Sequence, residues 1–355
     1  MTSRRVLLIA PLALLIAALA GCSSAAGSAV STDDATNDPR PHVLATTNVY
    51  ADIVTAVGAD DVVVDAIITN AAQDPHEYEV AVGDKLLASH ADLFVMNGGG
   101  YDSYMPGLIP EGAPVIVAAE SASDAPDVLE NEHDHSDHDH DHATEDHATE
   151  SADEHDHDHA TESADAHDHA TEGADEHDAP FNEHVWYDPD IMRAVADQIA
   201  AELGKLDPAH ASDFEKRAAE FGAGIDELDT QLAEAKTQYA GKSIFVTEPV
   251  PLRLTDRMGL VNETPEAFSE AVEEGQDVPP ATLLASLKII QSGDLGAVIV
   301  NAQTGGSETT QVSQEAEKEG VPVVEFAELL PEGQSYLSWM KANITALTTD
   351  LARGA

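Results

Sequence analysis

Short apolar runs alternate with helical patterns along most of this chain. Apolar runs of strand length occupy residues 42–47, 62–68, 93–97 and 115–118, and later residues 242–246, 297–301 and 321–326. Helical periodicity occupies residues 49–57 and 82–90, and later residues 252–258, 280–292, 309–319 and 335–351. Strands that alternate with helices predict parallel sheets covered by helices. We therefore expect an α/β fold of two lobes, each with a mostly parallel sheet flanked by helices.

One long amphipathic helix is predicted between the two lobes, after a shorter helix at residues 190–203. It covers residues 208–239, opens at Asp207-Pro208, and has apolar residues at spacings of four and three: Phe214, Ala218, Phe221, Ile225, Leu228 and Leu232. At 1.5 Å per residue it would be about 48 Å long, enough to join two lobes. The predicted organisation is an N-terminal lobe at 42–207, a linking helix at 208–240 and a C-terminal lobe at 241–355.

The N-terminus has the pattern of an export signal. Arg4 and Arg5 precede an apolar run at residues 6–20, and the run ends in Leu-Ala-Gly before Cys22, the one cysteine of the chain. This arrangement resembles a bacterial lipoprotein signal; the alternative is a secretory peptide with an incidental cysteine. We expect a signal peptide at 1–21, lipidation at Cys22, a flexible tether at 22–41 and export to the outer face of the cytoplasmic membrane.

Composition adds a strong negative charge and a histidine tract. The formal net charge of −51 excludes a general nucleic-acid binder, which needs a basic face. Residues 130–180 are rich in histidine, Asp and Glu and almost free of large apolar residues, so we expect a disordered loop within the N-terminal lobe. Imidazoles and carboxylates at this density favour an auxiliary metal-binding loop over a solvated acidic spacer. Its twelve histidines are His133, His135, His138, His140, His142, His147, His155, His157, His159, His167, His169 and His177.

Four residues outside the tract are candidates for a defined metal site. His76 follows Pro75 in the loop after a predicted strand, and His184 stands where apolar residues return after the tract. Glu248 and Glu328 each lie just beyond a predicted strand of the second lobe, where ligands of parallel sheets bind. Taken singly, each is more often an ordinary loop residue. Two glutamates that face two histidines across the lobes make a site between the lobes plausible.

Five motifs in order resemble one known family, the zinc/manganese solute-binding proteins of bacterial ABC importers. They are TNVYADI at 47–53, DPH at 74–76, ADL at 91–93, the residues 97–102 with NG and YD, and HVWYDP at 184–189. The resemblance implies a rigid linking helix and a metal held by His76, His184, Glu248 and Glu328. The family's third ligand is His in many zinc importers and Glu in many manganese importers, and its fourth is usually Asp, so Glu328 is a departure.

The resemblance also implies the partners and the cargo. A monomeric, lipid-anchored protein of this kind delivers metal to a membrane permease that works with a cytoplasmic ATPase. The carboxylate pair favours Mn²⁺ as the cargo, and the histidine tract favours Zn²⁺ more strongly. We therefore expect Zn²⁺ to be the cargo.

Two functions from other classes remain as alternatives. A zinc-dependent hydrolase would use His76, His184 and Glu248 with Glu77 as base, but the chain has no His-Glu-x-x-His helix and no nucleophile elbow. A zinc-buffering surface protein would work through the histidine tract alone, which leaves the two lobes without a purpose.

Overall fold

The computed structural model describes residues 38–70, 73, 75–76, 78–125 and 181–353. The predicted signal, Cys22 and the histidine tract lie outside these residues and stay predictions. Residues Arg40–Ala355 form one compact unit.

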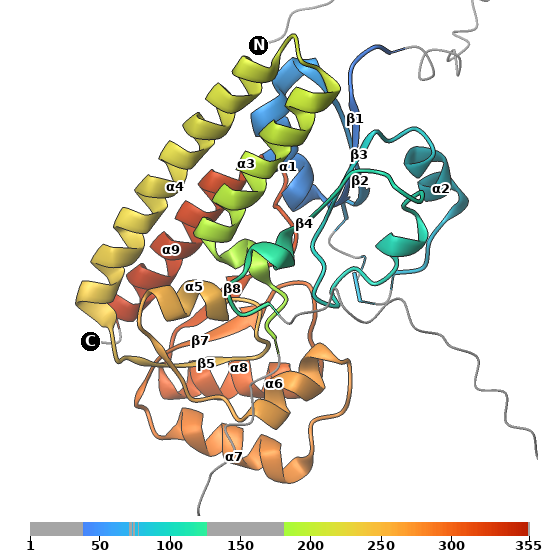
Figure 1. Cartoon of the computed structure of the whole chain (residues 1–355). Coiled ribbons are helices and arrows are strands. Elements are labelled where there is room, and N and C mark those ends of the chain that lie inside the picture. Colours follow the sequence, from blue (N-terminus) through green and yellow to red (C-terminus); the bar gives the residue numbers. More distant parts are fainter. Residues whose placement is uncertain (1–37, 71–72, 74, 77, 126–180, 354–355) are drawn as a thin grey trace, which may run out of the picture. The chain divides into compact units, whose positions relative to one another are not determined.

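Two parallel four-stranded sheets form the framework. The first contains β1 (His42–Thr47), β2 (Val63–Ile68), β3 (Leu93–Met96) and β4 (Val115–Val117) in the order β2-β1-β3-β4. The second contains β5 (Ser243–Val246), β6 (Val261–Asn262), β7 (Leu295–Asn301) and β8 (Val323–Phe326) in the order β6-β5-β7-β8. The predicted α/β class with two parallel-sheet lobes is therefore confirmed (Figure 1).

Helices cover both faces of each sheet, because successive strand residues point to opposite faces. In β1, Val43 and Ala45 pack towards α1 (Asn48–Gly58) and α3 (Pro189–Leu206), while Leu44 packs on the side of α2 (Val82–Ala88). In β5, Ile244 faces α9 (Tyr336–Arg353), and Phe245 faces α6 (Glu266–Glu273), α7 (Pro280–Gln291) and α8 (Ser307–Glu319). The short helix α5 (Leu252–Arg257) comes after β5 in the sequence.

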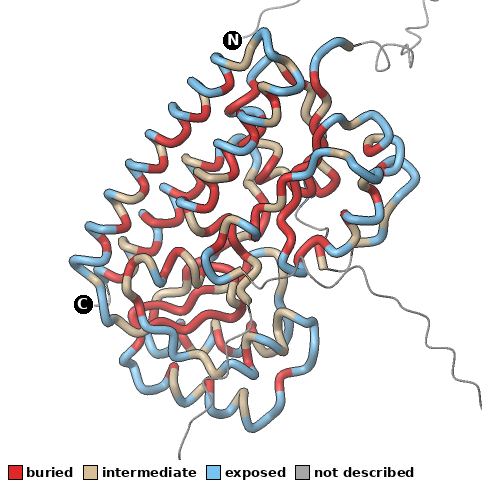
Figure 2. The backbone as a smooth tube through the Cα atoms, viewed as in Figure 1, coloured by how far each residue is buried: buried red, intermediate tan, exposed pale blue. Residues whose placement is uncertain are grey.

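The long helix α4 (Ala211–Tyr239) has 29 residues and begins three residues later than predicted. It contacts α1 and α3 of the first lobe and α5 and α9 beside the second sheet. Its apolar stripe is buried on the inner face, as the red segments of α4 show in Figure 2. One continuous core, which includes Val43 of β1 and Ile244 of β5, thus runs along this helix.

Close packing against neighbouring helices explains why two glycines occur inside α4. A Cβ at Gly224 would lie 2.4 Å from Leu337 Cδ1 of α9, and one at Gly222 would lie 3.0 Å from Arg193 Nη1 of α3. Arg193 Nη1 also donates to the Gly222 carbonyl at 2.9 Å. The glycines lower intrinsic helix propensity, and close contact with the neighbouring helices offsets that cost.

Charged residues brace the helices at the junction of the two sheets. Arg257, the last residue of α5, donates to Asp188 at 2.8 Å, to Asp190 at 2.9 Å and to Asp229 of α4 at 2.7 Å. These pairs hold α5, the start of α3 and the middle of α4 in one arrangement.

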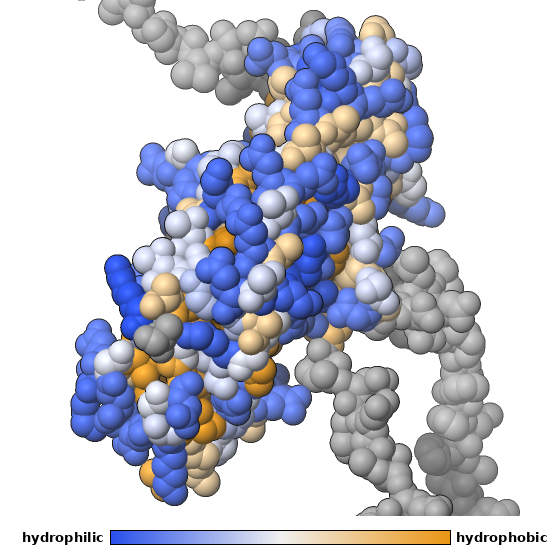
Figure 3. Space-filling view, turned by 90° about the vertical axis from the view of Figure 1, so that its left-hand side faces the viewer, coloured by the Kyte–Doolittle hydropathy of each residue, from blue (hydrophilic) through white to orange (hydrophobic). Residues whose placement is uncertain are grey.

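The surface seen in Figure 3 is mainly hydrophilic, with apolar residues in small separate areas. Within the described ranges, no helix is both long and apolar enough to pass through a bilayer.

Candidate metal centre

The carboxyl ends of the second sheet place two glutamates side by side. Glu248 follows β5 and Glu328 follows β8, and β7, which lies between these strands, ends at Asn301. The Asn301 amide donates one hydrogen bond to Glu248 Oε2 at 2.8 Å and another to Glu328 Oε1 at 2.7 Å. Both carboxylates are at least 96% buried, so these bonds offset part of the cost of removing charge from water. Asn301 was not predicted from the sequence, although it stands at the same strand edge.

His184 is presented by a short segment that its neighbour Asn182 organises. The Asn182 Oδ1 atom accepts from the backbone N–H of His184 at 3.0 Å and lies 2.9 Å from His184 Nδ1. Because an amide oxygen only accepts, Nδ1 carries the ring proton and Nε2 keeps its lone pair. His184 is 1% exposed, and burial lowers its pKa to about 3. The ring is therefore neutral at physiological pH, which is the form that binds metals.

His76 approaches from the loop after β2 and is only partly buried. Its Nε2 atom lies 3.3 Å from Glu183 Oε1, and its ring meets the ring of Tyr101 edge-on at 5.1 Å. A carboxylate beside His76 thus comes from Glu183, the residue before His184.

Tyr101 connects the histidines to the glutamates. It follows a tight turn in which Gly98, Gly99 and Gly100 all have positive φ, and Asp102 caps that turn by accepting from the backbone N–H groups of Asn97 and Gly98. The Tyr101 hydroxyl donates to Glu328 Oε2 at 3.0 Å. Burial raises the pKa of this phenol, so the hydroxyl remains a donor.

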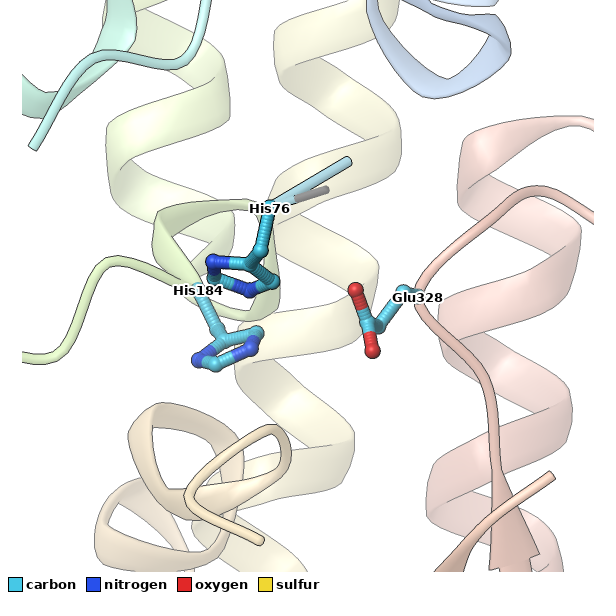
Figure 4. A group of neighbouring side chains, drawn as sticks. All are labelled: His76, His184 and Glu328. Atoms are coloured by element: carbon cyan, nitrogen blue, oxygen red, sulfur yellow. The ribbon is translucent and has the colours of Figure 1, made fainter. Parts of the chain in front are cut away.

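Three of the four residues expected as ligands come together. One ligand atom each from His76, His184 and Glu328 lies within 4.8 Å of the others, and Figure 4 shows the two imidazoles facing the carboxylate. Glu248 does not belong to this group in the described part of the chain. Its oxygens accept from Asn301 and from the Thr304 hydroxyl, which places it beside the group.

Two further glutamates border the group and were missed from the sequence. Burial, and then the charges of Asp102 and Glu328, raise the pKa of Glu183 to about 7. Burial, followed by Glu183 and Glu248, raises the pKa of Glu273 on α6 to about 8. The centre therefore combines two imidazoles with several carboxylates that repel one another.

Arg253 of α5 holds the segment that carries His184. Its guanidinium donates to the Asn182 carbonyl through Nε at 2.8 Å and through Nη2, and it pairs with Asp124 at 3.2 Å. It also lies over the ring of Phe181, 5.0 Å from the centroid. Arg253 of the second lobe thus positions the segment that carries His184 of the first lobe. Arg253 and Asn182 are 71 residues apart in the sequence, so no local pattern indicates their contact.

This arrangement has the chemistry of a cation site. Two imidazole nitrogens from the first lobe and a carboxylate oxygen from the second lie within 4.8 Å of one another. This set of ligand atoms suits a single divalent metal. A bound cation would also relieve the repulsion between the carboxylates.

Comparison with known proteins gives the family. The family model of the periplasmic zinc-uptake complex component A, ZnuA, matches residues 43–350, so the chain belongs to the ZnuA family. The high-affinity zinc uptake system protein ZnuA of Bacillus subtilis is 26% identical over 345 residues, 95% of this chain and 94% of that protein. The manganese ABC transporter substrate-binding lipoprotein PsaA of Streptococcus anginosus is 22% identical over 349 residues, 96% of each chain.

A solved structure has the same fold. The periplasmic zinc-binding protein TroA from Treponema pallidum superposes with a TM-score of 0.62 at 17% identity, over 88% of this chain and 99% of that one. The family match and the curated relatives confirm the resemblance to zinc/manganese solute-binding proteins of ABC importers. The relatives are named for two different metals.

Proposed function

We propose that this protein captures one Zn²⁺ ion between its two sheets and releases it to an ABC transporter permease. The observation that carries the proposal is the convergence of His76, His184 and Glu328 within 4.8 Å. These residues come from three separate segments and from both lobes. A site built in this way links metal binding to the relative position of the lobes, which a permease can sense.

The ligand chemistry supports a divalent cation and is compatible with Mn²⁺ as well as Zn²⁺. Zn²⁺ accepts imidazole nitrogen and carboxylate oxygen at about 2.0–2.2 Å, usually with four ligands. Glu248, which Asn301 holds beside Glu328, is the proposed fourth ligand. Mn²⁺ is the second candidate, because it prefers more oxygen ligands and the centre has a surplus of carboxylates.

The N-terminal features support a proposed attachment of the protein to a membrane surface. Relatives named as lipoproteins of metal ABC transporters support lipidation of Cys22 and attachment to the outer face of the cytoplasmic membrane. The partners in this proposal are the permease and its cytoplasmic ATPase, and the protein acts as a monomer. A Cys22→Ser variant should be released into the medium instead of fractionating with membranes.

The histidine tract is proposed as an auxiliary collector. Its imidazoles would bind Zn²⁺ more weakly than the folded centre, because the disorder expected from the composition of the tract adds an entropy cost to each chelate. Deletion of residues 130–178 should therefore leave one tight Zn²⁺ per chain and remove several weaker ones.

The alternatives have less support. The family is described as a component of an uptake complex, and relatives are named as substrate-binding proteins, which fits binding and transport better than hydrolysis. A buffer that works through the tract alone would have no use for the ligand group between the sheets.

A competition titration tests the proposal. The mature chain is titrated with Zn²⁺ against a fluorescent chelator, and the measurement is repeated for His76→Ala, His184→Ala and the exposed control His90→Ala. We expect each of the first two variants to lose the tight site and the control to keep it. Full affinity in either histidine variant would contradict the proposal, and competition of Zn²⁺ against Mn²⁺ in the parent protein decides the cargo.

A further inference from the structure

Helix α6 carries glutamates on the face that borders the metal centre. Glu266, Glu270 and Glu273 are spaced at i, i+4 and i+7, so they lie along one side of the helix. All three line a cavity of about 1040 Å³ that also has His76 and Glu183 in its wall. Of these three glutamates, Glu273 lies beside a candidate ligand, His184.

The opposite face of α6 anchors it on the second sheet. Phe268 is fully buried and meets the ring of Phe245 of β5 edge-on at 5.2 Å. Because α6 is fixed by this contact, the position of Glu273 at its C-terminal end is set by the core and not by a loose loop.

Glu273 lies beside the metal-binding nitrogen of His184. The distance from Glu273 Oε1 to His184 Nε2 is 3.8 Å, and Nε2 is the ring nitrogen that keeps its lone pair. Two ligands of one Zn²⁺ ion at tetrahedral angles are about 3.4 Å apart, given bonds of 2.0–2.2 Å. A cation bound at Nε2 would thus be within reach of the Glu273 carboxylate after a small side-chain rotation.

The charges around Glu273 also point to a cation. The charged groups that act most strongly on its carboxylate are three more carboxylates, those of Glu183, Glu248 and Glu328. Four carboxyl groups around two imidazoles repel one another when they are ionised, and a divalent ion at their centre changes that repulsion into attraction.

We propose that Glu273 is a further ligand of the transported cation and closes the site from the α6 side. The inference rests on the proposed function, since it concerns the ion held by His76, His184 and Glu328. An extra carboxylate oxygen raises the coordination number and makes the site more favourable for Mn²⁺ relative to Zn²⁺ than the other proposed ligands (His76, His184, Glu328 and Glu248) alone. Glu273 is therefore a determinant of metal selectivity.

Substitution of Glu273 by glutamine, with a control on the same helix, tests the proposal. Glu273→Gln keeps the shape of the side chain and removes its charge, and Glu270→Gln does the same for an exposed residue that lines the same cavity. Affinities for Zn²⁺ and Mn²⁺ are measured in the full mature chain by chelator competition. We expect Glu273→Gln to weaken Zn²⁺ about tenfold and Mn²⁺ by a larger factor, and Glu270→Gln to stay within about twofold.

Two further readouts separate a ligand from a structural residue. The Co²⁺-loaded protein should show stronger visible absorption in Glu273→Gln, because a lower coordination number intensifies these bands. The metal-free variant should unfold at a temperature no lower than that of the parent, since a repelled charge has been removed.

The outcomes also distinguish this inference from the proposed function. Equal affinities and equal Co²⁺ spectra in the Glu273 and Glu270 variants would overturn the role of Glu273, while loss of metal in His184→Ala would still support the site. Retention of metal in His184→Ala would overturn the proposed function itself.

Discussion

The two sheets contribute to the metal centre in different ways. The first lobe supplies imidazoles from loops: His76 is 28% exposed, and His184 is buried but depends on Asn182 for its orientation. The second lobe supplies carboxylates directly at strand ends, where Asn301 at the end of β7 donates to both Glu248 and Glu328.

The difference follows from charge. A neutral imidazole can change position at little electrostatic cost, so a loop is sufficient to hold it. A buried carboxylate without a cation is costly and needs hydrogen-bond donors at short range, which the rigid end of a parallel sheet provides. The second lobe is therefore the preorganised part of the site, and the first lobe is the part that completes it.

Among variants of the second lobe, the largest effect should come from the carboxylates. We expect Glu328→Ala to weaken Zn²⁺ binding by more than the roughly 10–100-fold that outer-shell partners of a metal contribute, and Glu248→Ala to weaken it less. The reason is that Glu328 belongs to the converging group and Glu248 lies beside it. Chelator competition measures both, with the exposed Glu325→Ala of β8 as control.

The sequence motifs favour the opposite order, because the match to the family is better around Glu248 than around Glu328. A larger loss in Glu248→Ala would show that the metal draws Glu248 into the site. The preorganisation of the second lobe would then be incomplete before binding.

A smaller effect is expected from Arg253, which connects the lobes. Arg253→Ala removes the hydrogen bonds to the Asn182 carbonyl and should weaken Zn²⁺ binding about 10-fold, through faster dissociation. Arg253→Lys should recover part of the loss. Stopped-flow chelation measures the dissociation rate.

Arg193→Ala is the matched control for this experiment. It removes an arginine that braces α3 on α4 and pairs with Asp226, away from the His184 segment. Equal dissociation rates in the Arg193 and Arg253 variants would mean that Arg253 affects only the stability of the fold. The segment that carries His184 would then need no support from the second lobe.

The smallest effect concerns the pH dependence of the metal-free protein. The pKa of Glu183 is raised from 4.5 to about 7, and that of Glu273 from 4.5 to about 8. At pH values between the ordinary and the raised pKa, the folded state therefore binds more protons than the unfolded state. Stability is therefore lost as pH rises from 6.5 to 8. His184 is neutral in the folded state because its pKa is lowered to about 3, whereas an unfolded histidine, with a pKa near 6.5, is largely neutral only above about pH 7.5. Its contribution, which has the opposite sign, is therefore confined to the lower part of this window and is smaller than that of the two carboxyl groups.

Differential scanning calorimetry tests this prediction. The melting temperature of the metal-free protein should fall by roughly a few degrees between pH 6.5 and 8, and the increase caused by Zn²⁺ should grow over the same range. Glu273→Gln should flatten the profile. A metal-free protein that becomes more stable as pH rises would contradict the assignment of protons to these carboxyl groups.

The sequence determined the class of fold through its hydrophobic pattern. The predicted strands and most helices appear close to their expected positions, because periods of two and of three to four residues are local properties. Among the β-strands and α-helices of the described residues, β6 and α6 were missed. β6 has only 2 residues, and α6 has 8 residues with glutamates that interrupt its apolar face.

The sequence also located the candidate ligands, since His76, His184, Glu248 and Glu328 stand at the ends of predicted strands or in motifs. Tertiary structure alone decided which of them converge and what holds them. Tyr101 meets Glu328 across 227 residues, and Glu273 reaches His184 from a helix without a motif. Such pairs carry no local periodicity, because their positions depend on how two separate sheets pack against one core. The sequence therefore specified the chemistry available to this protein, and the packing of its lobes decided the geometry of the site.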